Sequence, residues 1–251
     1  MKIINVNCFV GYDLDEIRPV VTAEQLLEQM AVNGVTESVT YHTRAVVQLD
    51  EGNEDIMKIA AASGGKIKPC WVTHPYMDGI QMPKPEDYKA LLRKERPAAV
   101  YLPVTKNGCP MDDFYCSELY EVLDELHMPT ILPLKNKAAR VREVLPEVSG
   151  KYPNIPFVLT DPDHTTELIN RMLLKKRQNI YLCVGFFCGT GSLDQLVAEF
   201  GAERFLFGGG PNNLAEGGLG LVYQGRFSEE DKEKIFHKNW ERLQEGIQWE
   251  S

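Results

Sequence analysis

Short apolar runs alternate with amphipathic stretches along the whole of this 251-residue chain. The apolar runs are nearly continuous and do not alternate with polar residues, which is typical of strands buried on both faces of a parallel sheet. We therefore predict eight strands, at residues 2–8, 37–42, 66–73, 98–104, 129–134, 155–161, 179–185 and 204–208.

The amphipathic stretches between these runs carry the signals of helix ends. Thr22 is a typical N-cap for a helix that ends at Gly34, and Ser228 precedes a segment with acidic residues in its first turn. On this basis we predict helices at residues 22–34, 53–65, 115–127, 137–152, 164–176, 192–201 and 228–244.

Eight strands that alternate with helices, in a chain of 251 residues, favour an α/β fold of the (β/α)8 TIM barrel type. An open doubly wound sheet is the alternative, but such sheets usually have fewer strands, and a closing helix after the eighth strand favours a barrel. The chain shows no linker or break in composition, so we predict one barrel domain over residues 1–251. In such barrels the active site lies at the carboxyl ends of the strands.

Composition and charge exclude several classes of function. Hydrophobic residues make up 43% of the chain and charged residues 25%, which is ordinary for a soluble globular protein. The net charge of −9 repels phosphate backbones, so we expect no nucleic-acid binding. No apolar run reaches the roughly 18 residues of a membrane span, and no signal peptide is recognisable, so we expect a cytoplasmic protein without membrane association. The six cysteines lack CxxC spacing and are expected to be reduced thiols.

The C-terminal quarter carries the most specific motif, FGAERFLFGGGPNN (200–213) followed by FSEEDKEKIFHKNWERL (227–243). It resembles the strand-eight signature of the amidohydrolase-2 family, FG-x-x-R-[LI]-[LM]-F-G-S-D-x-P, with Asn239, Arg242 and Leu243 matching the family's final helix. The segments PTILPLK and YPNIPFVLTDPDH are similar to family segments that end in histidine. The resemblance implies a TIM barrel of the amidohydrolase superfamily, whose members are metal-dependent hydrolases.

The chain departs from that family at the metal-ligand positions. The family's first strand ends D-x-H-x-H, in which two histidines on one face of the strand bind one metal. At the first-strand triplet, this chain has Asn5, Asn7 and Phe9. The histidines of strands five and six are replaced by Pro133 or Leu134 and by Asp161, and the catalytic aspartate of strand eight is replaced by Gly210. Amides are weak zinc ligands, and side chains of carbon and hydrogen bind no metal. We therefore expect no metal and no other cofactor, and the family's hydrolytic mechanism is not carried over.

Other polar residues at the predicted strand ends are candidates for metal-free chemistry. Asp161 and His164 follow strand six and could act as a general acid–base pair, although Asp163 as an N-cap would leave His164 in a solvated first turn. Lys135 could form a Schiff base or lie in a solvated loop, and Cys188 could be a nucleophile or an inert thiol.

The glycines after strands seven and eight allow a further interpretation, because phosphate-binding barrels often use those two loops. No Gly-Lys-Ser/Thr or GxGxxG motif accompanies them.

Three hypotheses therefore stay open. The first is a barrel without the metal site, acting as a small-molecule-binding pseudoenzyme or a metal-independent hydrolase or lyase. Its ligand-binding residues would be Asn5, Asn7, Lys135, Cys188, Gly209 and Gly210. The second is an active metal-dependent hydrolase or decarboxylase of a small carboxylic acid, and the third is a phosphate-ligand binder. A homo-oligomer is compatible with all three, because such barrels commonly pair through outer helices.

Overall fold

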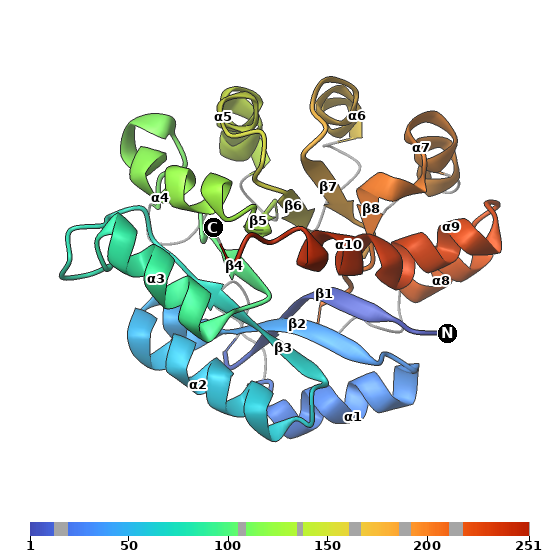
Figure 1. The fold of residues 1–251 in the computed structure, drawn as a ribbon. Coiled ribbons are helices and arrows are strands. Elements are labelled where there is room, and N and C mark those ends of the chain that lie inside the picture. The colour runs from blue at the N-terminus through green and yellow to red at the C-terminus, as the bar shows by residue number, and fades with distance from the viewer. Residues whose placement is uncertain are drawn as a thin grey trace.

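The computed structural model describes residues 1–12, 20–104, 109–134, 138–160, 167–185, 192–210 and 218–250. Its parallel strands form one sheet, in which each strand pairs with the next along the chain from β1 to β8. The Val6 N–H donates to the Phe207 carbonyl oxygen at 3.0 Å, which links the first strand to the segment after the last. The result is a nearly closed barrel with helices around it, and it confirms the predicted TIM-barrel fold (Figure 1).

All eight predicted strands are present. They are β1 Ile4–Val10, β2 Glu37–His42, β3 Ile67–Val72, β4 Ala99–Tyr101, β5 Thr130–Pro133, β6 Phe157–Thr160, β7 Ile180–Cys183 and β8 Phe205–Leu206. Several of these strands are shorter than predicted, because an apolar run indicates that residues are buried and not that their backbones pair with a neighbouring strand. Leu102, Val184 and Phe207, for example, are fully buried but lie beyond the ends of β4, β7 and β8.

The helices cover the outside of the sheet (Figure 1). They are α1 Ala23–Asn33, α2 Leu49–Ala62, α3 Pro85–Glu95, α4 Asp113–Glu125, α5 Ala138–Lys151, α6 Glu167–Lys176, α7 Ser192–Phe200, α8 Leu219–Gln224, α9 Glu229–Glu233 and α10 Asn239–Glu245. Thr22 caps α1 as predicted: its hydroxyl accepts from the Gln25 N–H, and the Gln25 side chain accepts from the Thr22 N–H. Gly34 then ends α1 in the left-handed conformation, with φ of 70°.

Two helices were not predicted. Helix α3 begins at Pro85 and has acidic residues in its first turn, which is a regular helix start. Only Tyr88 and Leu92 of this helix are buried, and the rest of its surface is mostly charged, so its apolar pattern is weak. Helix α8 is only six residues long and has a glycine next to each end.

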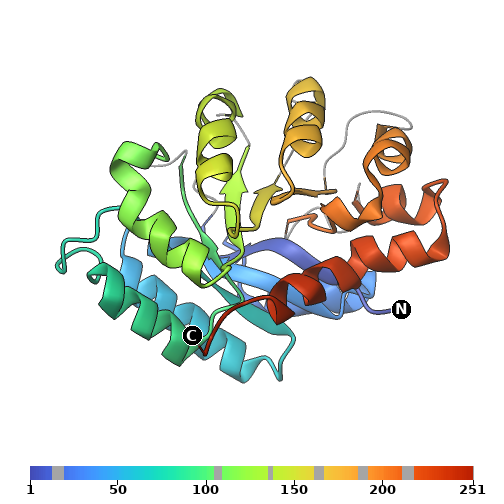
Figure 2. The ribbon, with the colours of Figure 1, turned by 45° about the horizontal axis from the view of Figure 1, so that its top comes forward.

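Apolar side chains form one cluster inside the barrel and another between the strands and the helices. The inner cluster takes Val39 and Tyr41 from β2, which lie two residues apart and so on one face of the strand. It also includes Trp240 and Leu243 of α10. Because the Gln244 side chain donates to the Ala98 carbonyl just before β4, α10 lies over the amino ends of the strands (Figure 2). The opposite, carboxyl end of the barrel is therefore the end where a site can form.

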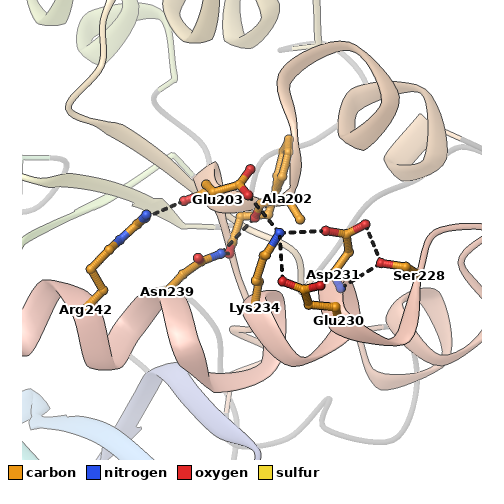
Figure 3. A network of polar contacts seen from close by, with 9 residues as sticks. Ala202, Glu203, Ser228, Glu230, Asp231, Lys234, Asn239 and Arg242 are labelled. Atoms are coloured by element: carbon orange, nitrogen blue, oxygen red, sulfur yellow. Dashed lines mark hydrogen bonds and ion pairs between the residues drawn. The ribbon is translucent and has the colours of Figure 1, made fainter.

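A polar network fixes this closing segment to β8 (Figure 3). The predicted helix at 228–244 consists of α9, a π-helical turn at 234–238 and α10. The buried Asn239 amide donates to the carbonyls of Ala202 and Phe205 at 2.8 and 2.9 Å. The Lys234 ammonium contacts the carboxylates of Glu203 and Asp231 at 2.9 and 3.1 Å. The buried amide contributes more than the partly exposed ion pairs, which are worth about 0–1 kcal/mol each.

In the described part of the chain, no helix combines the length and the apolar character that are needed to cross a membrane.

Candidate functional site

The first feature at the carboxyl end of the barrel is a hydrogen-bonded junction between β1 and the segment after β8. We call Asn5, Asn7, Gly209 and Gly210 the β1–β8 seam. Asn5 is fully buried, and its Oδ1 accepts the N–H groups of Asn7 and Gly209 at 3.2 and 3.0 Å. Its Nδ2 donates to the Gly210 carbonyl at 3.3 Å and to the Cys8 Sγ at 2.9 Å. Both lone pairs of the Asn5 amide oxygen and both hydrogens of its amide nitrogen therefore make hydrogen bonds within the protein.

A β-bulge shapes this part of β1. The pairing register between β1 and β2 shifts between Asn5 and Cys8, so the strand carries an extra residue there. A bulge of this kind bends the strand and changes the direction of nearby side chains. The Cys8 thiol is fully buried, and burial raises its pKa to about 12. It therefore stays protonated at neutral pH, as expected for an inert thiol.

The glycines after β7 and β8 are required by close packing. A Cβ atom added at Gly208 would lie 3.0 Å from the Cys183 Sγ and 3.1 Å from the Asn7 Cβ. A Cβ at Gly185 would overlap the Gly208 carbonyl oxygen. Gly210 has φ of +69°, which side chains other than glycine rarely adopt. The absence of side chains at these glycines therefore lets the backbones of the segments after β7 and β8 pack directly against each other.

Close packing weakens the phosphate hypothesis without removing it. The Gly209 N–H, one of the predicted anion donors, already donates to the Asn5 side chain. The two loops at 186–191 and 211–217, which would supply the other donors, lie outside the described residues.

Aromatic rings pack inside the barrel toward its carboxyl end. The rings of Tyr41 and Tyr101, near the ends of β2 and β4, stack with centroids 4.2 Å apart and planes at 14°. Phe9 of β1 lies with its ring centroid 6.0 Å from that of Tyr41. The two stacked tyrosines are buried and belong to the apolar inner cluster.

A buried hydroxyl lies on another strand of the same end. Thr160 is the last residue of β6, and it follows Val158, a member of the inner cluster, by two residues. Its side chain therefore faces the barrel interior. The Thr160 Oγ1 is buried and has no hydrogen-bond partner among the residues that the structure describes. An unpaired buried hydroxyl costs about 1–3 kcal/mol.

The structure places only some of the predicted site residues. Asn5, Gly209 and Gly210 are joined by hydrogen bonds, and the half-buried Asn7 lies beside Gly208. The remaining candidates lie outside the described residues, and their roles stay predictions: Asp161, His164, Lys135 and Cys188.

The described residues do not fit the metal of the amidohydrolase-2 pattern. The Asn5 amide is fully used within the protein, Phe9 has no donor atom, and Gly210 has no side chain. Among the described ranges, no group of three or more His, Cys, Asp or Glu residues could hold a metal ion. We therefore derive no chemical step through a metal.

The sequence patterns do not single out Tyr101 and Thr160 as residues inside the barrel. Each stands two residues after a member of the inner cluster, so the period of two along a strand is the signal that could have found them. They come after Ala99 and Val158, and both pairs lie within strands that were predicted. By contrast, no sequence pattern shows that the Thr160 hydroxyl lacks a partner among the described residues.

Known structures share this fold. The chain is similar to an uncharacterised TIM-barrel protein from Bordetella bronchiseptica (20% identity, 98% of this chain and 99% of that one, TM-score 0.73). It is similar to the 5-carboxyvanillate decarboxylase of Sphingomonas paucimobilis (13% identity, 98% and 99%, TM-score 0.75) and to an amidohydrolase II (15% identity, 97% and 100%, TM-score 0.73). No family model and no curated protein matches the sequence. The chain thus has the fold of the amidohydrolase-2 TIM barrels.

Proposed function

We propose that this barrel binds a small organic molecule at the carboxyl end of its strands, without the metal that the amidohydrolase-2 pattern uses. The observation that carries the proposal is the Asn5 amide. It joins β1 to the segment after β8 by direct hydrogen bonds to Gly209 and Gly210, where the pattern has the aspartate of D-x-H-x-H and the catalytic aspartate after strand eight. A fully bonded amide has no lone pair left for a metal ion.

The lining of the barrel supports binding of an organic molecule. The stacked rings of Tyr41 and Tyr101 give this end of the barrel an apolar lining. Ligand sites in proteins are typically apolar, with a few polar groups that fix the orientation of the ligand. The net charge of −9 favours a small molecule over a nucleic acid as the partner.

A ligand screen tests this proposal. The protein is treated with a chelator, desalted and titrated with a panel of small aromatic and aliphatic carboxylic acids, with binding followed by NMR. We expect at least one compound to bind the metal-free protein and to shift the Asn7 side-chain amide resonances. Binding only after metal is added would contradict the proposal.

A catalytic version of the proposal uses Asp161 and His164 as a metal-independent acid–base pair. It requires turnover by the chelated protein, and loss of that turnover in Asp161→Asn with ligand binding retained. If the chelated protein binds a compound but does not convert it, the pseudoenzyme version is supported.

A metal-dependent decarboxylase is the second candidate function. The observation that favours it is the similarity to the 5-carboxyvanillate decarboxylase, which extends over 98% of this chain. Release of carbon dioxide from an aromatic carboxylic acid that needs added zinc or manganese would support this candidate over the first.

A further inference from the structure

A cavity lies outside the barrel, between the carboxyl ends of β1 and β2 and the helices α1 and α2. Its volume is about 600 Å³, which is the size of a site for a small molecule. Its apolar lining includes Val10, Val21 and Ile59, which belong to the cluster between strands and helices or pack against it. His42 also lines the cavity, and it directly follows Tyr41 of the inner cluster. Because neighbouring residues on a strand point to opposite faces, this cavity is separate from the barrel interior.

Backbone contacts hold the walls of this cavity. The Gly11 N–H donates to the Val21 carbonyl at 2.8 Å, and the Val21 N–H donates to the Gly11 carbonyl at 2.9 Å. This pair of bonds fastens the end of β1 to the start of α1. A Cβ atom added at Gly11 would overlap the Thr43 Oγ1, so the segments after β1 and β2 also pack directly against each other. The cavity is therefore bounded by segments that are fixed to one another.

The His42 imidazole is held in one tautomer in the wall of this cavity. Its Nδ1 accepts the Arg44 backbone N–H at 3.1 Å. A ring nitrogen that accepts a hydrogen bond carries no proton, so the proton of the neutral ring is on Nε2. Burial lowers the pKa of His42, so the ring is neutral at pH 7. The Nε2 is therefore an N–H donor with a fixed orientation.

This donor is unused and accessible. The His42 Nε2 has no hydrogen-bond partner among the residues that the structure describes. His42 is only half-buried, and its Nε2 is not one of the fully buried unpartnered atoms, so a ligand can reach it. The adjacent Cε1 is turned toward Gly11, another lining residue, because a Cβ added at Gly11 would lie 3.4 Å from it. The Nδ1 edge of the ring thus faces the Arg44 backbone, and the Cε1–Nε2 edge faces the cavity.

The charged groups of the lining are already bonded. Among the described residues that line the cavity, these groups are Glu24 and Arg44, which have opposite charges. The Arg44 guanidinium pairs with the Asp55 carboxylate at 3.0 Å. The Glu24 carboxylate accepts its own backbone N–H and bonds with the Thr22 side chain, and these contacts lower its pKa. The cavity therefore favours an uncharged guest, because a charged one would lose hydration without gaining an unused partner.

We propose that this cavity binds an uncharged, mostly apolar molecule whose carbonyl oxygen accepts a hydrogen bond from the His42 Nε2. The apolar part of the ligand contacts Val10, Val21 and Ile59. His42 acts here as a donor and not as a base, because the Nε2 lone pair is occupied by the proton. The site is additional to the one proposed inside the barrel and does not depend on it.

Acetophenone and 2-phenylpropene test the proposal. The two molecules have nearly the same shape, but the first has a carbonyl oxygen where the second has a CH₂ group. The whole chain is titrated with each at pH 7, and the ring nitrogen resonances of His42 are followed by NMR. We expect acetophenone to bind about fivefold more tightly than the alkene, because it gains one neutral hydrogen bond, and to shift the Nε2 resonance. Equal binding of the two molecules, or no binding of acetophenone up to its solubility limit, overturns the proposal.

Substitutions of His42 separate its two ring nitrogens. The amide oxygen of His42→Asn takes the place of Nδ1, so this variant keeps an acceptor for the Arg44 N–H but has no donor at Nε2. It should lose the preference for acetophenone. The amide nitrogen of His42→Gln reaches the place of Nε2, so this variant should retain the preference.

His74→Asn is the matched control. His74 is also half-buried, and burial lowers its pKa, but it does not line this cavity. The control should bind both molecules as the wild type does. If the preference survives in His42→Asn, or if His74→Asn removes it as well, the proposal is wrong. The ligand screen for the barrel is unaffected by these outcomes, because His42 points away from the barrel interior.

Discussion

Replacement of Thr160 by valine should stabilise the protein, which is unusual for a polar-to-apolar change at a strand end. The Thr160 Oγ1 is buried and has no partner in the described part of the chain, so folding removes it from water without replacing its hydrogen bonds. Valine has nearly the same shape and the same branched Cβ, and it fits the same strand conformation. The change therefore removes a desolvation penalty and adds no cavity.

The expected gain follows from that penalty. An unsatisfied buried hydroxyl costs about 1–3 kcal/mol, so we expect the free energy of unfolding to rise by about 1 kcal/mol. For a chain of this size, that corresponds to a rise in Tm of about 2–4 °C. The free energy is measured by urea denaturation followed by circular dichroism, and Tm is measured by calorimetry.

Thr40→Val is the matched control. Thr40 is also fully buried in a strand, but its hydroxyl lies 2.8 Å from the Ser38 hydroxyl, to which it is hydrogen-bonded. Here the same substitution should lower the free energy of unfolding by about 1 kcal/mol. If Thr160→Val destabilises the protein as much as Thr40→Val does, the Thr160 hydroxyl has a partner and the reasoning fails.

Three further predictions concern the seam, the glycines and pH. Asn5→Ala leaves buried backbone groups without partners and should cost about 3 kcal/mol of unfolding free energy in urea denaturation, whereas a loss below about 1 kcal/mol would show that the amide does not hold the seam. Gly185→Ala should cost about 1–3 kcal/mol because its Cβ would overlap the Gly208 carbonyl; an unchanged Tm would contradict this close approach. Burial lowers the pKa of His42 and His74, so the unfolded state binds more protons, and stability should be lost as pH falls below about 6.5; the same Tm at pH 5 and pH 7 would refute it.

The sequence predicts the fold well where burial is strong and continuous. Residues 37–42 were predicted as a strand and form β2 with those bounds. At β8 the pattern extends over 204–208, but only Phe205–Leu206 pairs with β7, because the chain turns away at the glycines. Helix α3 was missed because most of its surface is charged, so its short apolar face gives a weak periodic signal.

The site is less accessible from sequence, because its defining bonds join distant residues. Asn5 contacts Gly209 and Gly210 across separations of 204 and 205 residues in the sequence. No local pattern shows that its side-chain amide is fully hydrogen-bonded. The order of strands does place these residues at the same end of the barrel, which is why three of them were predicted together. What the strand order cannot give is whether a side chain at that end is free or already bonded.

Elemental analysis of the untagged protein tests directly whether this barrel holds a metal ion. The protein is incubated with zinc or manganese, desalted and analysed by mass spectrometry, with an Asn5→Ala sample alongside. We expect less than one equivalent of either metal in the wild type, because the Asn5 amide is bonded to the backbone of Gly209 and Gly210. One retained equivalent in the wild type, lost in Asn5→Ala, would contradict this expectation.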